Sequence, residues 1–151
     1  MKAKDIMSAD VFTVKKDTSV GEIAHLLTEK NISGVPVVDD RGAVVGMVTQ
    51  RDLLYKDVEP RFPAVAQILG GTLFLQGAAH YNEELRKLAA VKAEDLMTKR
   101  VFTVEEDTEV KRVAELMVER EINRVPVTRN GKLTGIISRA DIVRNIAKMM
   151  E

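Results

Sequence analysis

The sequence predicts a mixed α/β fold built from two copies of one small unit, each with the element order β-α-β-β-α. The main observation is an internal repeat: residues 5–38 align with residues 95–128 without a gap, and 16 of the 34 aligned positions are identical. At the next turn the second copy is one residue shorter than the first. From this turn onward two glycines and an aspartate still recur. These matches are Gly42 with Gly131, Gly46 with Gly135 and Asp52 with Asp141. Two copies are too few for a solenoid, so we expect two units packed about a pseudo-two-fold axis.

In the first copy, a short β-branched and aromatic run, Val11–Val14, predicts the opening strand. Asp17 and Thr18 then signal a turn and the start of a helix. From Val20 onward the apolar residues follow a helical spacing that ends near Asn31, so this stretch should form an amphipathic helix.

Two paired strands follow in the first copy. Val35–Val38 is a continuous apolar run with a proline near its start, where a missing backbone donor costs little. The polar turn Asp39–Gly42 joins it to a second run, Ala43–Thr49, so the two runs predict a β-hairpin. A helix should begin directly after this hairpin and carry Leu53 and Leu54 into the core.

The second copy repeats this order with one shorter turn. Its expected elements are strand Val101–Val104, a helix from Thr108 to about Arg120, strand Val125–Thr128, strand Lys132–Ser138 and a helix from about Arg139 to Met149. The turn between its last two strands, Arg129–Gly131, contains the Asn-Gly pair that favours tight hairpins.

The segment between the copies matches neither of them. Pro60 and Pro63 punctuate its start, and Asn82–Ala90 has the pattern of an amphipathic helix. Because residues 57–90 are too apolar for a disordered tether, we expect them to fold over the module or into a dimer contact. The predicted organisation is a first domain at 1–58, a partly helical linker at 59–90 and a second domain at 91–151.

The composition narrows the classes of protein to consider. The chain has 23 basic and 23 acidic residues, so no net field favours nucleic acid or an anionic membrane. It has no cysteine, which excludes disulfides, thiolate chemistry and cysteine-based zinc sites. No apolar run approaches the roughly 20 residues of a membrane span, and the amino terminus leads into no signal-peptide core. These features predict a cytoplasmic protein with no membrane partner and no direct contact with nucleic acid.

One motif occurs in both copies at the junction of a strand and a helix. Gly46–Asp52 and Gly135–Asp141 both fit the pattern Gly-apolar-x-Thr/Ser-x-x-Asp, and each follows an Ile-x-x-Val-Pro-Val segment at nearly the same distance. Asp5–Ser8 and Asp95–Thr98 open the copies with the pattern Asp-apolar-Met-Ser/Thr. In this order, and twice, the set resembles the CBS domain, named for cystathionine beta-synthase, in the tandem form called a Bateman module. The resemblance covers nearly all of the chain outside the linker.

The resemblance implies a function as well as a fold. In CBS pairs the sheet of each unit packs against that of its twin, and two clefts between the twins take adenosine-containing ligands such as AMP, ADP, ATP or S-adenosylmethionine. Such modules sense metabolite state, regulate a protein target without catalysis, and commonly form disk-shaped homodimers. For this chain the resemblance predicts a regulatory sensor of an adenosine ligand and a homodimer, with no required cofactor.

The hydroxyl and the carboxylate of the recurrent motif suit a ribose. Thr49 and Asp52 in the first copy, and Ser138 and Asp141 in the second, should lie on one side of a helix's first turn. The carboxylate can accept hydrogen bonds from both ribose hydroxyls, and the free N–H groups at the helix start favour a phosphate. Ser/Thr-x-x-Asp is also an ordinary helix-capping arrangement, so capping is the alternative interpretation of both pairs.

The Val-Pro segments complete the expected clefts. In relatives the backbone before the proline faces the adenine edge and apolar residues enclose the ring, which assigns Val35, Pro36, Val125 and Pro126 to the ligand. The alternative is that the valines are core residues and the prolines only set how the strand begins. Both roles are compatible with one structure.

The copies differ just before the second Val-Pro segment. Asn123 and Arg124 stand where the first copy has Ser33 and Gly34. Relatives often place a basic residue at the position of Arg124 to meet ligand phosphates across the cleft, and an arginine can do so with two hydrogen bonds. We therefore expect Arg124 to serve the cleft that contains the ribose pair of the first copy. The alternative is a solvated surface arginine with a weak salt bridge.

Catalysis finds little support in the sequence. The two histidines, His25 and His80, have no recurrent partner and no second histidine at a metal-binding spacing. The chain has no nucleophile elbow and no phosphate-binding Walker loop. The sequence thus predicts a binding module and not an enzyme. The alternatives are a structural dimerisation module with empty clefts, and a module that regulates DNA or RNA binding.

Overall fold

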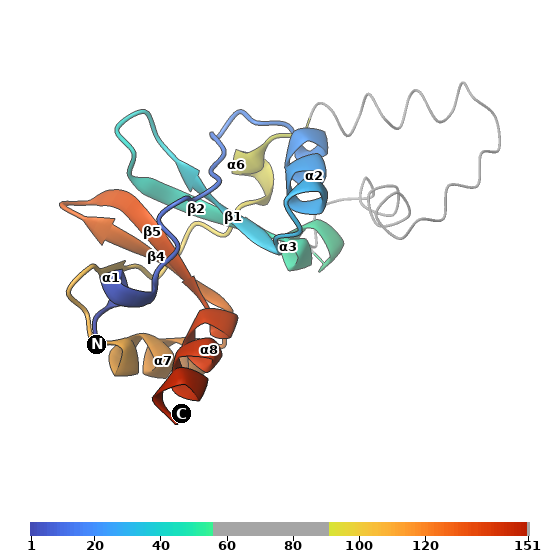
Figure 1. Ribbon diagram of the computed structural model, residues 1–151. Coiled ribbons are helices and arrows are strands. Elements are labelled where there is room, and N and C mark those ends of the chain that lie inside the picture. The colour runs from blue at the N-terminus through green and yellow to red at the C-terminus, as the bar shows by residue number, and fades with distance from the viewer. Residues whose placement is uncertain (56–90, 151) are drawn as a thin grey trace, which may run out of the picture. The chain divides into compact units, whose positions relative to one another are not determined.

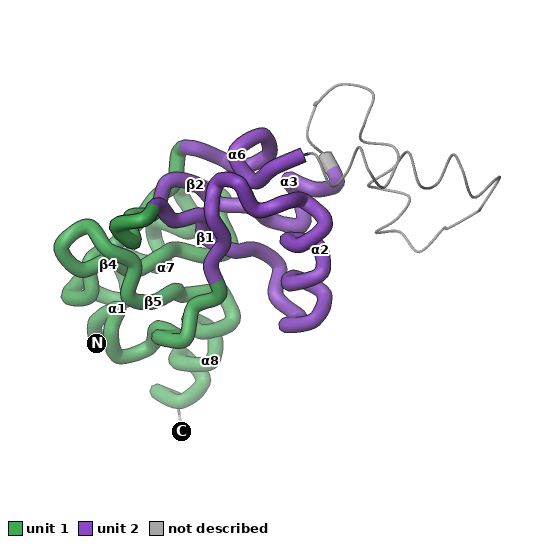
Figure 2. The backbone as a smooth tube through the Cα atoms, turned by 90° about the horizontal axis from the view of Figure 1, so that it is seen from above, with its two compact units in different colours: residues 1–12, 40–44, 100–151 green, residues 13–39, 45–99 purple. Residues whose placement is uncertain are grey.

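The computed structural model of the chain describes residues 1–55 and 91–150 (Figure 1). Within these ranges it confirms the predicted mixed α/β fold, with helices beside one two-stranded and one three-stranded sheet. The segment 57–90, including the helix predicted at Asn82–Ala90, lies outside the described residues. The chain divides into two compact units, coloured separately in Figure 2, and each unit draws on both repeats.

Unit 2 comprises residues 13–39 and 45–99. Its described elements are α2 (Val20–Glu29), β1 (Gly34–Val38), β2 (Val44–Thr49, whose first residue falls to unit 1), α3 (Gln50–Tyr55) and α6 (Ala93–Leu96). Strands β1 and β2 form one sheet, and Val14 extends it by a single parallel bridge to Val37.

Helix α2 shows how the sequence sets a helix start in this unit. Ser19 is the N-cap: its hydroxyl accepts from the backbone N–H of Glu22 at 3.2 Å, and the Glu22 carboxylate accepts from the N–H of Ser19 at 3.0 Å. This capping box satisfies two N–H groups that would otherwise lack partners. The stripe Val20, Ile23 and Leu27 is buried, and burying each such side chain contributes roughly 1.5–3 kcal/mol. The buried face of the helix is therefore the one that the apolar spacing predicts.

Unit 1 comprises residues 1–12, 40–44 and 100–151. Its described elements are α1 (Ala3–Ile6), β3 (Val104–Glu105), α7 (Val110–Glu119), β4 (Arg124–Arg129), β5 (Lys132–Ser138) and α8 (Arg139–Met149). Strand β3 runs parallel to β4, and β4 pairs with β5 in an antiparallel hairpin. At its turn Asn130 and Gly131 have φ values of 52° and 75°, as a tight two-residue turn requires. The predicted Asn-Gly turn is confirmed.

Each core is completed by the opening segment of the other repeat. The unit 2 core contains Ala93, Leu96 and Met97, which belong to the second repeat. The unit 1 core contains Ala3 from the first repeat, with Met7 packed against it. The repeats therefore exchange their opening segments. The short helices α1 and α6, which these segments form, were not predicted from the sequence.

A glycine in each unit makes room for a methionine of the exchanged segment. A Cβ added at Gly46 would collide with the Met97 side chain, and one added at Gly135 would collide with that of Met7. Both glycines lie within strands, β2 and β5, where a missing side chain permits another segment to approach closely. The recurrent glycine and the recurrent methionine thus form one Gly–Met contact in each unit, always between repeats.

The predicted opening strands are shorter than expected. Of Val11–Val14 only Val14 forms a bridge, and the strand predicted at Val101–Val104 is replaced by β3, which begins at Val104. The physical reason is burial: Val14 and Val104 are the buried members of their runs, whereas Phe12 is 37% exposed. A β-branched run forms a strand only where its side chains fit a half-buried, pleated surface.

Two helix predictions also need correction. Helix α7 begins at Val110 and not at Thr108, because the N–H of Thr108 donates to the carbonyl of Glu105 in a turn, at 3.0 Å. On α3, Leu53 is buried as predicted, but Leu54 is 43% exposed. With 3.6 residues per turn, neighbouring side chains of a helix point about 100° apart, and only one of the two leucines faces the core.

Candidate functional site

The first hydroxyl–carboxylate pair lies in unit 2, where β2 ends and α3 begins. Oδ2 of Asp52 accepts from the backbone N–H of Thr49 at 2.9 Å and from its hydroxyl at 3.2 Å. In return the Thr49 hydroxyl accepts from the N–H of Asp52 at 3.2 Å. Thr-x-x-Asp at a strand–helix junction forms this reciprocal cap because the first turn of a helix leaves N–H groups without partners.

A third side chain reaches the same carboxylate from the second repeat. The Thr98 hydroxyl donates to Oδ1 of Asp52 at 3.2 Å. The backbone holds Thr98 in place, since its N–H and C=O both pair with Met47 of β2, at 2.9 and 3.0 Å. Sequence reasoning missed Thr98. The signal that could have found it is its place as the last residue of the recurrent quartet Asp-apolar-Met-Ser/Thr.

The second pair lies in unit 1, at the junction of β5 and α8, and has the same geometry. Oδ2 of Asp141 accepts from the N–H of Ser138 at 2.8 Å and from its hydroxyl at 2.6 Å. Oδ1 of Asp141, however, accepts from the Arg144 guanidinium at 3.2 Å. The two carboxylates therefore differ in their outer partner, which is a neutral hydroxyl at Asp52 and a cation at Asp141.

Both pairs adopt the capping arrangement that was the alternative to ribose binding. Capping occupies Oδ2 of each carboxylate, while a carboxylate offers about four acceptor positions in all. At Asp52, Oδ1 accepts from one neutral hydroxyl, a partner that a ribose hydroxyl can join or replace without any change of charge. The geometry is compatible with a ribose at Asp52 and Asp141, and their assignment to a ligand stays a prediction.

The Val-Pro segments lie at the start of β1 and β4. Val35 and Pro36 in β1, and Val125 and Pro126 in β4, are all buried. The two valines have no exposed surface, which makes them core residues, as the alternative interpretation holds. In unit 2 the Pro36 carbonyl accepts from the N–H of Val14 at 3.1 Å and so belongs to the sheet. A contact of these segments with an adenine ring stays a prediction.

The residues just before these segments tie each strand to the helix that follows its hairpin. The carbonyl of Asn123 accepts from the backbone N–H of Arg139, the first residue of α8, at 3.0 Å. In unit 2 the carbonyl of Ser33 accepts from the N–H of Gln50, the first residue of α3, at 2.9 Å. Asn123 therefore contributes its backbone to the same junction that holds the hydroxyl–carboxylate pair of unit 1.

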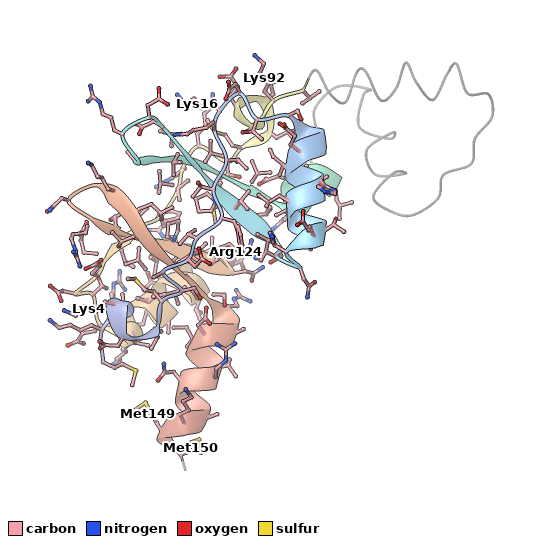
Figure 3. The ribbon with its side chains drawn as sticks, turned by 45° about the horizontal axis from the view of Figure 1, so that its top comes forward. Lys4, Lys16, Lys92, Arg124, Met149 and Met150 are labelled. Carbon is pink, nitrogen blue, oxygen red and sulfur yellow. The ribbon has the colours of Figure 1, made fainter. Side chains whose placement is uncertain are left out.

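Arg124 opens β4 directly opposite Ser138 in the hairpin ladder (Figure 3 labels it). Burial lowers the pKa of its guanidinium, because a partly buried site disfavours the charged form. Arg124 therefore holds a partly desolvated positive charge within the unit that contains Ser138 and Asp141. The prediction that it serves the ribose pair of the first copy concerns the other unit and stays a prediction.

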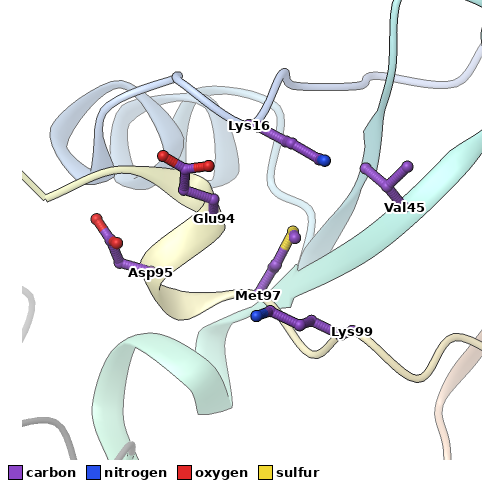
Figure 4. A pocket seen from close by; sticks show the side chains of 6 residues that line it. All are labelled: Lys16, Val45, Glu94, Asp95, Met97 and Lys99. Carbon is purple, nitrogen blue, oxygen red and sulfur yellow. The ribbon is translucent and has the colours of Figure 1, made fainter.

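Unit 2 also has a surface pocket of about 480 Å³ that was not predicted from the sequence (Figure 4). Its lining residues are Lys16, Val45, Glu94, Asp95, Met97 and Lys99. The two lysines and the two carboxylates balance in charge and are all exposed, so their field selects neither an anion nor a cation. None of the predicted ligand residues lines this pocket.

Within the described ranges, no group of three or more histidine, aspartate or glutamate side chains is arranged to hold a metal ion. His25 is exposed on α2 and lies 3.5 Å from the Glu29 carboxylate. His80 lies outside the described residues. At the two strand–helix junctions the structure assembles hydrogen-bond donors and acceptors that cap helices α3 and α8.

Comparisons with known proteins agree with the fold and the recurrent motifs. Residues 3–59 and 93–148 each match the CBS domain. The uncharacterised protein YlbB of Bacillus subtilis is 34% identical over 142 residues, which are 93% of this chain and 79% of YlbB. The inosine-5′-monophosphate dehydrogenase of Methanocaldococcus jannaschii is 31% identical over 144 residues, which are 95% of this chain but only 23% of that enzyme.

Two solved structures are similar over nearly the whole chain. The crystal structure of CBSX2 in complex with AMP has a TM-score of 0.74 and 30% identity, and the similarity covers 99% of both chains. CBSX2 is a CBS-pair protein of Arabidopsis thaliana. The CBS domain pair of protein MJ0100, in complex with 5′-methylthioadenosine and S-adenosyl-L-methionine, has a TM-score of 0.71 and 27% identity, and the similarity covers 99% of this chain and 98% of that one.

Proposed function

Because the chain belongs to the CBS-domain family, we propose that it is a non-catalytic regulatory module that binds an adenosine-containing ligand. The observation that carries the proposal is the hydroxyl–carboxylate pair at a strand–helix junction, which occurs in both units. Each pair places a carboxylate oxygen beside the first turn of a helix. There a ribose diol can donate two charge-assisted hydrogen bonds, and the N–H groups of the helix start favour a phosphate.

The relatives support adenosine as the common part of the ligand. One similar structure is a complex with AMP, and another is a complex with 5′-methylthioadenosine and S-adenosyl-L-methionine. We therefore propose AMP, ADP, ATP or S-adenosylmethionine as the regulatory ligand. The residues proposed to bind it are Val35, Pro36, Thr49, Asp52, Asn123, Arg124, Val125, Pro126, Ser138 and Asp141.

The proposal assigns no reaction to the chain. The hydroxyls of Thr49 and Ser138 donate to the carboxylates that cap the same helices, an arrangement that orients binding groups and supplies no histidine base to activate a nucleophile. The similarity to inosine-5′-monophosphate dehydrogenase covers less than a quarter of that enzyme and gives no ground for transferring its activity.

A thermal-shift panel tests the proposal. The panel compares AMP, ADP, ATP, NAD and S-adenosylmethionine with GMP, GTP and inorganic phosphate as controls. A ligand at 100 times its dissociation constant adds about 2.7 kcal/mol of stability, which is a readily measured rise in Tm. A shift with adenosine compounds alone supports the proposal. No shift with any of them would favour the alternative, a structural dimerisation module whose capping boxes and buried valines are complete without a ligand.

Arg124→Gln should separate phosphate recognition from adenosine recognition. If Arg124 meets the phosphate of a ligand held at Thr49 and Asp52, AMP and ATP should prefer that site, and the preference should fall as salt rises because phosphate pairing is screened. The variant should erase this preference at a cost of about 1.5–3 kcal/mol while adenosine binds as before. Arg100→Gln, which changes an exposed arginine, is the matched control. A crystal soaked with AMP that holds the nucleotide only at Ser138 and Asp141 contradicts the assignment.

We also propose that the chain is a homodimer. Unit 1 exposes apolar side chains on α7 and α8; they are Val118, Val143, Ile146 and Met149, with Met150 directly after α8 (Figure 3 labels the last two). Val143, Ile146 and Met149 recur at every third position and so share one helix face, which a second copy would remove from water.

Light scattering should therefore give twice the mass of the chain. The double variant Val143→Glu with Ile146→Glu should give the single mass, because two buried carboxylates cannot be accommodated without partners. Lys148→Glu, a charge change on the same helix, should leave the dimer intact. A single-chain mass for the unmodified protein at working concentration speaks against the dimer.

We also propose that the chain regulates a protein target and is cytoplasmic. No helix in the part of the chain that the structure describes is long and apolar enough to cross a membrane. With 23 basic and 23 acidic residues the chain carries no net charge, so we expect the target to be a protein and not a nucleic acid. No cofactor is required for binding in this proposal.

A further inference from the structure

Each opening segment docks on the other repeat through the same backbone hydrogen bonds. The segments are Met1–Ser8 (opening segment 1) and Val91–Thr98 (opening segment 2). In unit 1 the N–H of Lys4 donates to the carbonyl of Glu106 at 3.0 Å, and in unit 2 the N–H of Glu94 donates to the carbonyl of Lys16 at 3.0 Å. Because the matching bonds are alike, the backbone does not distinguish one segment from the other.

The methionine and alanine contacts do not distinguish the segments either. Met7 and Met97 are the same residue type at matching positions, and each packs against a glycine, Gly135 or Gly46. The opening helices also share a buried alanine at the same position, Ala3 in α1 and its match in α6. At these two positions shape and hydrophobicity suit either segment. The next apolar residue differs, since Leu96 is fully buried in unit 2 and Ile6 is only partly buried in unit 1.

The charges at the docking positions, in contrast, are inverted. Opening segment 1 carries Lys4 where opening segment 2 carries Glu94, and the second repeat carries Glu106 where the first carries Lys16. A basic segment therefore meets an acidic repeat in unit 1, and an acidic segment meets a basic repeat in unit 2. If each segment docked on its own repeat, Lys4 would face Lys16 and Glu94 would face Glu106, two contacts of like charge.

The lysines of opening segment 1 form their ion pairs with Asp107, the residue that follows Glu106. Nζ of Lys4 lies 2.8 Å from Oδ1 of Asp107, and Nζ of Lys2 lies 3.1 Å from the same oxygen. The hydrogen bond with Asp107 raises the pKa of Lys4. Asp107 matches Asp17 of the first repeat, however, so it would attract a lysine in either position. The choice between repeats therefore rests on Glu106 and its match in the first repeat. The Glu106 carboxylate accepts hydrogen bonds from Arg129 and acts on Lys4 through its charge alone.

We propose that the inverted charges select the partner of each opening segment: the Glu106 surface of the second repeat takes the basic segment, and the Lys16 surface of the first repeat takes the acidic one. The contacts on which this rests are those of the described structure, and the proposal is independent of any ligand. Lys4, Lys16 and Glu94 are exposed, whereas Glu106 is buried and already paired with Arg129. Each reversal should therefore change the preference only roughly two- to five-fold, and salt should weaken it.

The absence of cysteine in the chain permits a direct competition experiment. Ser8 and Ile136 exchange both backbone hydrogen bonds, at 2.9 and 3.0 Å, so their Cα atoms should lie about 5.5 Å apart, within the range of a disulfide. Met47 is the match of Ile136 in the first repeat. In the triple variant Ser8→Cys, Met47→Cys and Ile136→Cys, the thiol at position 8 can pair with position 136 after exchange, or with position 47 without it.

The triple variant is equilibrated in a glutathione buffer at low salt, and mass spectrometry measures the ratio of the two disulfides. With native charges the 8–136 disulfide should dominate. Adding Lys4→Glu and Glu94→Lys should move the ratio several-fold toward 8–47, and the neutral pair Lys4→Gln and Glu94→Gln should give an intermediate ratio. All differences should shrink in 1 M salt, where the Debye length is about 3 Å.

The control moves the same charges elsewhere: Glu29→Lys with Lys148→Glu, both exposed in the structure, should leave the ratio unchanged. Equal ratios for the native, neutral and reversed charges would overturn the proposal. The covalent linkage of each segment to its neighbours in the chain would then be what places it on the other repeat. A control that shifts the ratio as far as the test variant would overturn it as well. If the exchanged variant does not fold, the neutral pair alone decides between these outcomes.

Discussion

Replacing Gly46 with alanine should lower the free energy of unfolding by about 1–3 kcal/mol, the usual cost of overpacking a core. The added Cβ would collide with the Sδ and Cγ atoms of Met97 and would lie 3.0 Å from its Cβ. The end of the Met97 side chain can turn away, but its Cβ moves only with the backbone, which the hydrogen bonds between Thr98 and Met47 hold against β2. Urea unfolding followed by circular dichroism measures the change.

Two further variants decide whether the Gly–Met contact is the cause. Gly21→Ala in α2 is the matched control: its Cβ would come no closer than 4.0 Å to another group, so the variant should gain roughly 0.4–1 kcal/mol. In a Met97→Ala background the penalty of Gly46→Ala should shrink, because the contacts with Sδ and Cγ are gone and only the contact with the Cβ of residue 97, at 3.0 Å, is left. Distant sites do not show such non-additivity. A Gly46→Ala variant as stable as the parent, or a penalty that is undiminished without the methionine, would contradict this account of the exchanged segment.

Much of the local structure could be predicted because its causes are local. The stripe Val20, Ile23 and Leu27 marks the buried face of α2, and the Asn130–Gly131 pair marks the tight turn of unit 1. The strand predicted at Val11–Val14 was wrong in length, because not all apolar residues of this run are buried in a core. A local sequence pattern thus predicts an element well where the apolar residues of the pattern are the ones that the core buries.

The exchange of opening segments could not be predicted from the same patterns. Met7 and Met97 recur together with Gly46 and Gly135, but recurrence does not say which methionine packs against which glycine. That information lies in contacts between residues far apart in sequence. Thr98 was missed for the same reason: the spacing Thr-x-x-Asp identifies the pair at Asp52, whereas its third partner comes from 46 positions away.

Replacing Asp52 with alanine should weaken binding of an adenosine ligand at that site by about 1.5–3 kcal/mol, the scale of hydrogen bonds to a charged group. In dissociation constant this is a loss of about 10- to 150-fold. The ribose hydroxyls would lose an acceptor whose Oδ2 caps α3 and whose Oδ1 accepts only neutral donors among the described residues. Titration calorimetry with AMP measures the loss.

The control must separate ribose binding from capping, since Asp52→Ala also removes a helix cap. Glu22→Ala breaks the capping box of α2 in the same unit and should cost a similar stability of about 0.5–2 kcal/mol. It should leave the affinity for AMP unchanged. Thr98→Val should free Oδ1 of Asp52 without removing the carboxylate, and so should keep binding. Equal affinity in Asp52→Ala, Asp141→Ala and the unmodified protein would remove the ribose assignment.

The most direct test of the central claim is a crystal structure of the protein with AMP. The account predicts that the ribose hydroxyls lie about 2.5–3.0 Å from a carboxylate oxygen of Asp52, of Asp141 or of both, with the phosphate beside the first turn of α3 or α8. A nucleotide bound with its ribose away from both carboxylates would contradict it. Crystals that take up neither AMP nor S-adenosylmethionine at concentrations that saturate related CBS pairs would contradict it as well.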